Sequence, residues 1–348
     1  MRLTQPQIAL SNSGFSLIEF MVATVLGLII TAGAISVYLV SKRSFIEAEQ
    51  VAAVSENGRF AMQLLSSSVR HAGFFGGASP SDIRGGVLTV DDDCSGDAAA
   101  YLVNRPFFAQ NASGAAVYGC IDDAQPGTDV LVLKNVEPAP LYDADPDDPN
   151  ASKDGILSFT RSAPMPPATL QAPWSERETY VVANTEGGRL IGGGDTAPGV
   201  GAGEELASAA AWPYRFQIYY VRNADVPTLA RKYLAWDTTE GAMTLQTQDL
   251  VQGVENMQFR FGVDSDNDGE VDSFAAAAAV EADNAWDRVM SLQAFILIRA
   301  EQEDPAYTNE KTYSLPSGAI TPGDSFRRVL LFSELTLRNP RLVLRGGA

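Results

Sequence analysis

Acidic residues alternate with other residues over a short stretch in the last third of the chain, and this spacing suits a metal ion. The acidic positions are Asp264, Asp266, Asp268, Glu270 and Asp272, with Gly269 in the sixth place. Calcium takes six to eight oxygen ligands from carboxylates, backbone carbonyls and water, and a glycine at the sixth position allows a sharp turn. We therefore predict a calcium site. The first three aspartates would bind through their side chains and Glu270 through its backbone oxygen, while Asp272 would bind directly or through water.

The stretch resembles the first half of a calcium loop of the EF-hand type, with one departure. At the twelfth position, Ala275 replaces the usual bidentate glutamate. Glu281, Asp283 or a more distant residue would have to complete the coordination, and we expect weak affinity. The alternative is an acidic hairpin turn, because Asp, Asn and Gly are ordinary turn residues. Mutual repulsion of the carboxylates without a cation favours calcium, and no organic cofactor is expected.

A second candidate lies near the N-terminus, where a carboxylate stands at the start of an apolar segment of membrane length. The string Gly14-Phe15-Ser16-Leu17-Ile18-Glu19 opens an apolar run that lasts to Val40. About 20 apolar residues span a bilayer. A charge in such a segment is costly and is normally kept for a partner or a function. The sequence therefore predicts a membrane helix in which Glu19 serves a specific contact.

Two ordinary explanations account for only part of this region. A secretory signal peptide has its cleavage site after the apolar core, whereas Gly14 precedes the apolar run. A plain membrane anchor would explain Phe20 to Val40 but not Glu19. One basic residue precedes the run and two follow it closely, so the positive-inside rule does not by itself favour a cytoplasmic N-terminus.

The spacing of Gly14, Phe15 and Glu19 resembles the type III signal sequence of type IV prepilins and type II secretion pseudopilins. The resemblance implies that a prepilin peptidase cuts between Gly14 and Phe15 and methylates the new N-terminus at Phe15. It also implies that Glu19 acts in subunit assembly. On this interpretation residues 1–14 are a leader peptide and residues 15–40 a transmembrane and assembly helix.

The helix should continue beyond the membrane segment, to about residue 70, with a different pattern. From Ser41 apolar residues recur every three or four positions, as on a helix with one buried face. The stripe comprises Val51, Val54, Gly58, Met62, Leu65 and Val69. Glycines at 73, 76 and 77 should end the helix. We assign residues 41–72 to this amphipathic continuation and residues 73–348 to a periplasmic, β-rich globular domain.

Strand signals dominate after the helix, and the predicted fold class is α+β. Segments rich in Tyr, Phe, Val and Ile suit a half-buried pleated surface. They are Asp129–Lys134, Thr179–Ala183, Tyr214–Arg222, Arg231–Trp236, Met257–Val263, Val289–Arg299 and Arg327–Arg338. Because strands follow one another without intervening helices, we expect a mainly antiparallel sheet with the long N-terminal helix packed on it, as in pilins.

Further segments are similar to PilW-type minor pilins of the type IV pilus, which are related to the J-type pseudopilins of type II secretion. They are Asn57–Leu65, Arg70–Gly76, Tyr219–Arg222, Pro227–Arg231, Gly253–Phe259 and Leu337–Asn339. Residues 78–200 contain no such segment. The resemblance implies a structural minor pilin, not an enzyme, that helps to initiate pilus assembly and is incorporated near the tip.

The same resemblance implies partners and a location. The expected partners are other minor pilins and the major pilin, through the N-terminal helix, together with prepilin peptidase and the inner membrane. Before assembly the chain would be a single-pass inner-membrane protein with a periplasmic C-terminal domain, and afterwards part of an extracellular pilus. No nucleic acid is expected, because the 348-residue chain has a net charge of −18 and phosphate binding depends on clustered Lys and Arg.

The chain has two cysteines, Cys94 and Cys120, which belong to no CxxC or Cys/His metal pattern. In an exported domain one disulfide is the simple interpretation, and two reduced thiols are the alternative. A disulfide would close a Gly- and Asp-rich region and add about 3–4 kcal/mol to its stability by the loop-entropy argument.

A membrane-anchored exported enzyme or ligand-binding domain, or a type II secretion pseudopilin, remains the alternative function. The chain lacks the nucleotide-binding GxxxxGK[ST], the zinc-binding HExxH and the hydrolase GxSxG strings, and its one histidine is His71. Glycosidase chemistry needs only two carboxylates and leaves no such motif. The mature N-terminus would separate the two classes of function.

Overall fold

The computed structural model describes residues 16–85, 88–142, 159–160 and 174–339. The predicted leader, the cut site and residue 15 lie outside these ranges. The chain divides into two compact units, residues 1–52 and residues 53–348. Helix α1 (Leu17–His71) begins in the first unit and ends in the second, which confirms the predicted long helix.

The part of α1 in the first unit carries large apolar side chains that are exposed. Leu28 and Ile30 are each more than 70% exposed. Among the described residues α1 is the one helix long and apolar enough to cross a membrane. A helix that is apolar on all sides is stable in lipid, where its backbone groups bond within the helix.

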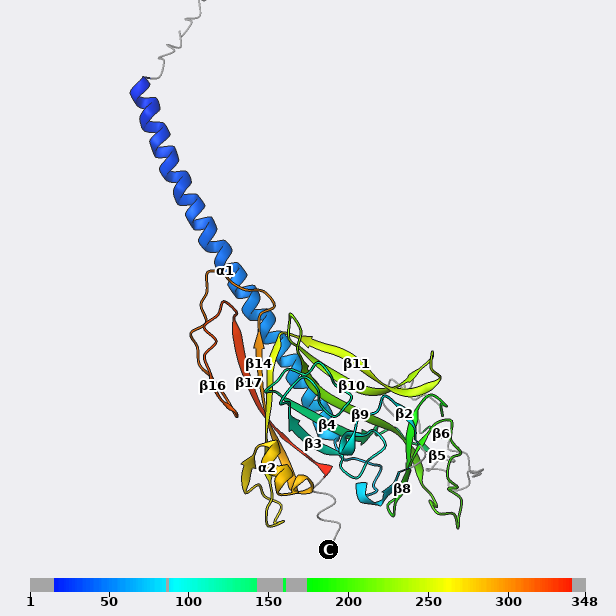
Figure 1. Ribbon diagram of the computed structural model, residues 1–348. Coiled ribbons are helices and arrows are strands. Elements are labelled where there is room, and N and C mark those ends of the chain that lie inside the picture. The colour runs from blue at the N-terminus through cyan, green and yellow to red at the C-terminus, as the bar shows by residue number, and fades with distance from the viewer. Residues whose placement is uncertain (1–15, 86–87, 143–158, 161–173, 340–348) are drawn as a thin grey trace, which may run out of the picture. The chain divides into compact units, whose positions relative to one another are not determined.

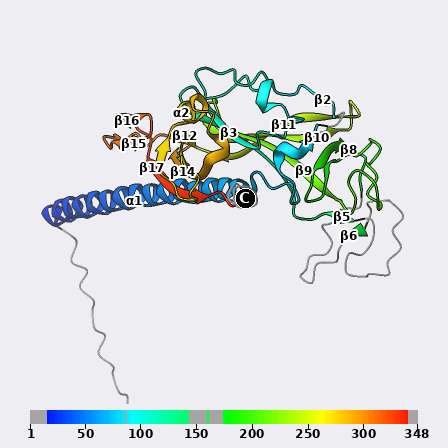
Figure 2. The ribbon, with the colours of Figure 1, turned by 90° about the horizontal axis from the view of Figure 1, so that it is seen from below.

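The part of α1 in the second unit buries one face against a sheet. The buried positions are Val54, Gly58, Ala61, Leu65 and Val69. The predicted stripe is therefore correct at four positions and wrong at Val51, which is 43% exposed; Met62 is half-buried and Ala61 lies on the buried face instead. Gly58 allows close approach, because a Cβ there would overlap the side chain of Leu331. Figures 1 and 2 show β14 and β17 alongside this part of the helix.

A four-stranded antiparallel sheet in the order β13–β12–β14–β17 provides that surface. Its strands are β12 (Val254–Val263), β13 (Ser273–Ala275), β14 (Val289–Arg299) and β17 (Arg328–Thr336). The short α2 (Ala277–Ala282) and the 3₁₀ turn η3 (Trp286–Arg288) connect β13 to β14. A hairpin of β15 (Tyr313–Leu315) and β16 (Gly318–Ile320) precedes β17.

A larger sheet of eleven strands, counted within the described residues, forms the rest of the second unit. Along its main path the strand order is β1–β8–β7–β9–β10–β11–β2. Four further strands lie off this path. Of these, β3 pairs with β4, β4 and β5 each pair with β9, and β6 pairs with β5. All pairs are antiparallel except β1 with β8 and β11 with β2. The first strands are β1 (Ile83–Arg84), β2 (Val90–Asp91), β3 (Phe107–Asn111), β4 (Asp129–Val136), β5 (Leu141–Tyr142) and β6 (Phe159–Thr160). The others are β7 (Thr179–Ala183), β8 (Gly188–Gly192), β9 (Ala210–Arg222), β10 (Thr228–Asp237) and β11 (Ala242–Gln252).

The two sheets share one core. Phe107 on β3, Phe261 on β12 and Trp286 in η3 meet edge to face, with ring centroids 4.8–6.1 Å apart. The buried carboxylate of Asp129 on β4 accepts a hydrogen bond from the backbone N–H of Phe259 on β12 at 2.7 Å. These contacts fix the end of β12, and so the start of the acidic loop that follows it. The long helix and the mostly antiparallel sheets confirm the predicted α+β class.

Candidate functional site

The N-terminal end of α1 is capped by Ser16 together with Glu19, the residue that the sequence singled out for assembly. Ser16 precedes the helix, and its Oγ accepts a hydrogen bond from the N–H of Ile18 at 3.3 Å. The Oε2 of Glu19 accepts one from the N–H of Ser16 at 3.0 Å. This reciprocal arrangement is a capping box, in which a Ser and a Glu three residues later satisfy free N–H groups at the helix start.

Glu19 is thus held at the positive end of the helix macrodipole, which favours a carboxylate. Its second oxygen, Oε1, makes no hydrogen bond with a described residue. The carboxylate can therefore serve its own helix with one oxygen and a partner cation with the other. The capping role was missed in the sequence, although Ser16-Leu17-Ile18-Glu19 fits the S-x-x-E pattern.

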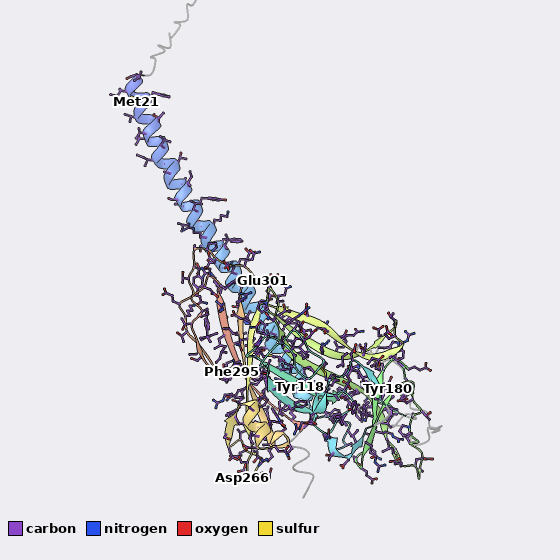
Figure 3. The ribbon with its side chains drawn as sticks, in the orientation of Figure 1. Met21, Tyr118, Tyr180, Asp266, Phe295 and Glu301 are labelled. Atoms are coloured by element: carbon purple, nitrogen blue, oxygen red, sulfur yellow. A yellow bond between two sulfur atoms is a disulfide. The ribbon has the colours of Figure 1, made fainter. Side chains whose placement is uncertain are left out.

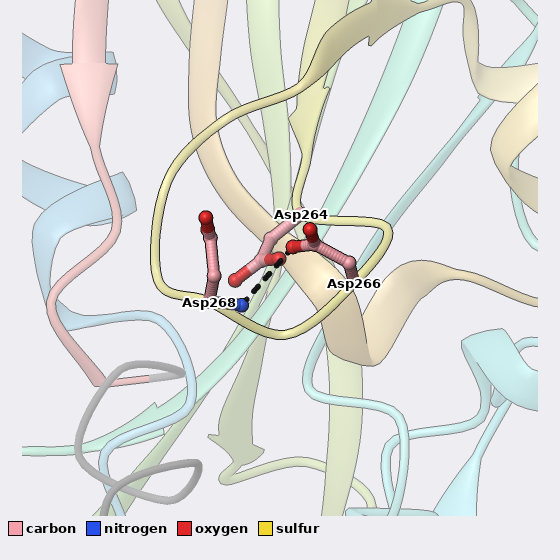
Figure 4. A group of neighbouring side chains, drawn as sticks. All are labelled: Asp264, Asp266 and Asp268. Carbon is pink, nitrogen blue, oxygen red and sulfur yellow. Dashed lines mark hydrogen bonds between the residues drawn. The ribbon is translucent and has the colours of Figure 1, made fainter.

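The acidic loop connects β12 to β13, and three of its carboxylates converge. Asp264, Asp266 and Asp268 each place one oxygen within 4.8 Å of those of the other two. Figure 4 shows the Asp264 carboxylate lying between the other two. At that separation two unit charges repel by about 1 kcal/mol even in bulk water.

Backbone N–H groups hold the loop in this form. The N–H of Gly269 donates to Oδ2 of Asp264 at 2.8 Å, and the N–H of Asp268 donates to Oδ1 of Asp266 at 3.2 Å. The N–H of Glu270 donates to Oδ1 of Asp268 at 2.8 Å. Gly269 has φ +89°, a conformation that glycine adopts without strain.

Asp264 differs from the other two aspartates in its burial. It has no exposed surface, whereas Asp266 and Asp268 are exposed. Its backbone N–H donates to the carbonyl of Arg288 at 3.0 Å, which ties the loop to η3. Its Oδ1 is buried and has no hydrogen-bond partner. A buried polar atom without a partner is uncommon and costs free energy.

The other carboxylates considered for the site, and the residue at its twelfth position, lie outside the cluster. The Oδ2 of Asp272 accepts a hydrogen bond from the N–H of Ser265 at 2.7 Å, and Asp272 is not part of the three-carboxylate cluster. Glu281, one residue considered for completing the coordination, binds the indole N–H of Trp286 at 2.6 Å and Arg105 at 3.2 Å. Ala275 pairs with Phe261 in the sheet. Of the side chains predicted as ligands, the structure therefore brings together those at positions one, three and five of the loop.

Cys94 and Cys120, which are 26 positions apart in the sequence, form a disulfide with a Cα–Cα distance of 4.8 Å. The enclosed segment includes β3, whose five residues pair with β4. Beside it the fully buried Lys134 donates to the carbonyls of Asp97 and Ala99 at 2.7 and 2.8 Å and to that of Leu102. The disulfide and this lysine together organise a segment with few strands of its own.

Burial lowers the pKa of the Lys134 amine to about 7, and the nearby carboxylates of Asp93 and Asp97 oppose this shift. Burial also raises the pKa of Asp93, although its carboxylate accepts hydrogen bonds from the N–H groups of Ala100 and Cys94. Sequence reasoning placed Lys134 at the end of a strand and gave it no role. Its only sequence signal is a cation at the end of an apolar run.

A groove of about 770 Å³ in the second unit contains side chains of the types used in acid–base catalysis. It is lined among others by His71, Arg177, Arg215, Arg231, Tyr233 and Trp236. Its two carboxylates, Glu137 and Glu178, both bind Arg215, at 2.7 and 3.0 Å. His71 is exposed, with its Nδ1 2.9 Å from the carbonyl of Ser67. The carboxylates are thus held in ion pairs, which does not favour the acid and base pair of a glycosidase.

One comparison with known proteins gives a match. Residues 218–339 match the family model described as type IV pilus-assembly protein W, PilW. This region runs from β9 to the end of β17 and contains the acidic loop. No curated protein and no solved structure matches the chain.

Proposed function

We propose that this chain is a PilW-type pilus protein that acts in type IV pilus assembly as a minor pilin, since residues 218–339 match the PilW family model. In this role it helps to initiate the pilus with other minor pilins and is itself incorporated, near the tip. It is a structural subunit without catalytic activity, and PilW is a pilus-assembly family.

The observation that carries the proposal is the presence of two independent features in one chain. The family match covers residues 218–339, while the membrane-length helix with Glu19 at its first turn lies about 200 residues earlier. An enzyme anchored in the membrane needs the helix but has no use for a carboxylate at its start. A subunit that must be lifted from the membrane into a fibre needs both.

The proposed sequence of events begins in the inner membrane. The chain is held there by a single span with its C-terminal domain in the periplasm, an oxidising compartment that suits the disulfide between Cys94 and Cys120. Prepilin peptidase cuts between Gly14 and Phe15 and methylates Phe15. The subunit then joins neighbouring minor and major pilins through its N-terminal helix and becomes part of the extracellular pilus.

Glu19 would select and align the incoming subunit. A charge in an apolar surrounding is costly unless it is paired, and the terminal amine created by the cut would supply a cation at the same end of a neighbouring subunit's helix. Pairing of the two would satisfy both charges only when the helices are in the correct register. The free Oε1 of Glu19 is the atom available for this contact.

The test is the N-terminus of the native protein and its place in the cell. Mass spectrometry of protein from membranes and from sheared pili should find N-methylated Phe15. Gly14→Leu should leave an uncut precursor and few pili, whereas Gly33→Leu, the same change inside the apolar run, should be cut normally. A mature N-terminus beyond residue 30 would exclude the pilin role, and a correctly cut protein absent from pili would favour a secretion pseudopilin.

A further inference from the structure

We propose that the β12–β13 loop binds one calcium ion through Asp264, Asp266, Asp268 and the backbone carbonyl of Glu270, while Asp272 positions the loop without touching the metal. This site is independent of the minor-pilin role. The ligand assignment differs from the sequence-based one, in which Asp272 was a fifth ligand.

The buried oxygen of Asp264 is the observation that points to a cation. An acidic cluster on a surface is common without a metal, and the exposed Asp266 and Asp268 alone would carry no inference. Asp264, however, is fully buried and its Oδ1 has no hydrogen-bond donor. The carboxylates that it faces are acceptors too and cannot supply one. A cation among the three carboxylates satisfies this oxygen and removes the repulsion at once.

The chemistry of the donors favours calcium over magnesium. Three carboxylates and one carbonyl are hard oxygen ligands, and the remaining positions are open to water. Calcium accepts such irregular shells of six to eight oxygens, whereas magnesium requires a compact octahedron and gives up its waters reluctantly. Because the twelfth position is Ala275 and Glu281 is bound to Trp286 and Arg105, the shell lacks a bidentate carboxylate. We therefore expect a Kd of about 10⁻⁴–10⁻³ M, as in extracellular modules.

Asp272 is a positioning residue in this arrangement. Its Oδ2 is bonded to the N–H of Ser265, which closes the loop between the first two aspartates. Asp272→Asn keeps an oxygen acceptor for that hydrogen bond and should bind calcium with less than a threefold change in Kd. Asp272→Ala loses the hydrogen bond and should bind more weakly.

The experiment uses the full-length chain in detergent, freed of metal with a chelator. The buffer contains 0.15 M salt, so that adding calcium changes the general screening of the chain's charges very little. The first probe is terbium luminescence, excited through tryptophan, because Trp286 lies two residues before Arg288, the partner of the Asp264 N–H. Calcium should displace terbium with the Kd given above. The second measurement is the melting temperature, which calcium should raise and equimolar magnesium should raise much less.

Asp266→Asn combined with Asp268→Asn is the decisive variant, since both side chains are exposed and their loss leaves the core intact. It should lose at least tenfold in affinity and show no calcium-dependent rise in melting temperature. Glu301→Gln with Glu303→Gln is the matched control, which removes two exposed charges elsewhere. Figure 3 shows Glu301 and Asp266 far apart in the molecule. The control should behave as the parent.

Asp264→Asn gives a further signature that a merely acidic turn would not give. Without calcium this variant should be at least as stable as the parent, because it removes a buried charge, and with calcium only the parent should gain stability. Equal calcium responses in the parent and in the Asp266/Asp268 variant, or equal responses to magnesium and calcium, would overturn the proposal.

Discussion

At the scale of single residues, Glu19 makes one observed contact, the helix cap, and one that the minor-pilin proposal requires, and the two depend on different properties of its side chain. Accepting the Ser16 N–H needs only an oxygen, and glutamine serves equally in a capping box. Pairing with a neighbouring amine needs a negative charge. Glu19→Gln should therefore keep amide protection at Ser16, whose N–H donates to this side chain, in hydrogen exchange of the detergent-solubilised chain, but produce few pili.

Glu19→Ala should lose both the protection and the pili, and Glu49→Ala, a carboxylate loss farther along the same helix, should lose neither. Electron microscopy of pili and hydrogen exchange of the same variants give the two readouts. Normal pilus numbers in Glu19→Gln would mean that helix capping, not charge, is the function of this residue.

Lys134 allows a second prediction at this scale. Lys134→Met leaves three backbone carbonyls without their donor, and should lower the free energy of unfolding by about 3 kcal/mol in urea titrations of the full chain. The exposed Lys311 changed to Met should have little effect.

The pH dependence of that difference follows from the pKa. Burial lowers the pKa of Lys134 from 10.5 to about 7, so between these pH values the unfolded chain holds a proton that the folded chain lacks. The stability that Lys134 contributes should therefore rise with pH from about 7 to 10.5, by at most about 1.4 kcal/mol per unit, and fall as the pH is lowered through that window. A difference between the parent and Lys134→Met that does not change with pH would contradict this assignment.

At the scale of elements, the turn that follows α1 depends on a close contact between Gly76 and Trp212. Gly76 has φ +69° and lies against the ring of Trp212 on β9, which a Cβ would overlap. Gly77 has φ +101°, but a Cβ there would meet only Thr185 at 3.8 Å. Both Gly→Ala changes lose about 1–2 kcal/mol through the left-handed backbone, and Gly76→Ala should lose about 1–3 kcal/mol more through overpacking.

Urea denaturation of the two glycine variants, side by side, measures the difference. Equal losses would mean that Trp212 shifts freely, and that the turn rather than the packing determines how α1 joins the sheet. The ring of Phe74, edge to face with Trp212 at 5.5 Å, is the neighbour that should resist such a shift.

The disulfide between Cys94 and Cys120 allows a prediction about the sheet. Because the enclosed segment contains β3, reduction should affect the sheet as well as the loop around it. We expect a loss of about 3–4 kcal/mol and faster hydrogen exchange at Phe107–Asn111 and in their partner strand β4. The far strand β17 should keep its protection, and a uniform loss over both sheets would instead indicate global destabilisation.

The elements show what the sequence could and could not predict. The predicted strands at 179–183 and 289–299 are correct to the residue, and the others fall within or near observed strands, because their apolar residues are dense enough to mark a buried strand. Strand β11 was missed because Thr, Gln and Asp separate its apolar residues, so that no apolar run marks it. Several of its residues are exposed, which explains why polar side chains occur there. The parallel pairs of β1 with β8 and β11 with β2 join distant segments that no local pattern records.

For the molecule as a whole, the sequence was most informative at its two ends. The membrane helix and the family region, residues 218–339, carry local signals of composition and motif. The acidic loop was also visible, since its ligands are neighbours in the chain, but the burial of Asp264 and the engagement of Glu281 were not. Both depend on η3 and α2, which lie next to the loop only once the sheet has folded. The match to a pilus-assembly family was thus easier to predict than the surroundings of these carboxylates.

The disulfide between Cys94 and Cys120 also determines how the chain responds to pulling, a load that it would bear if, as proposed, it is part of a pilus fibre. Force travels along the covalent chain, and the bond lets it pass directly between two Cα atoms 4.8 Å apart. The segment between the cysteines, including β3, is thereby shielded from tension. In an optical trap the oxidised chain should unfold with a contour length about 85 Å shorter than the reduced chain, given about 3.5 Å for each residue added to the extension. Reduction would expose this segment to tension and add its length to that of the extended chain.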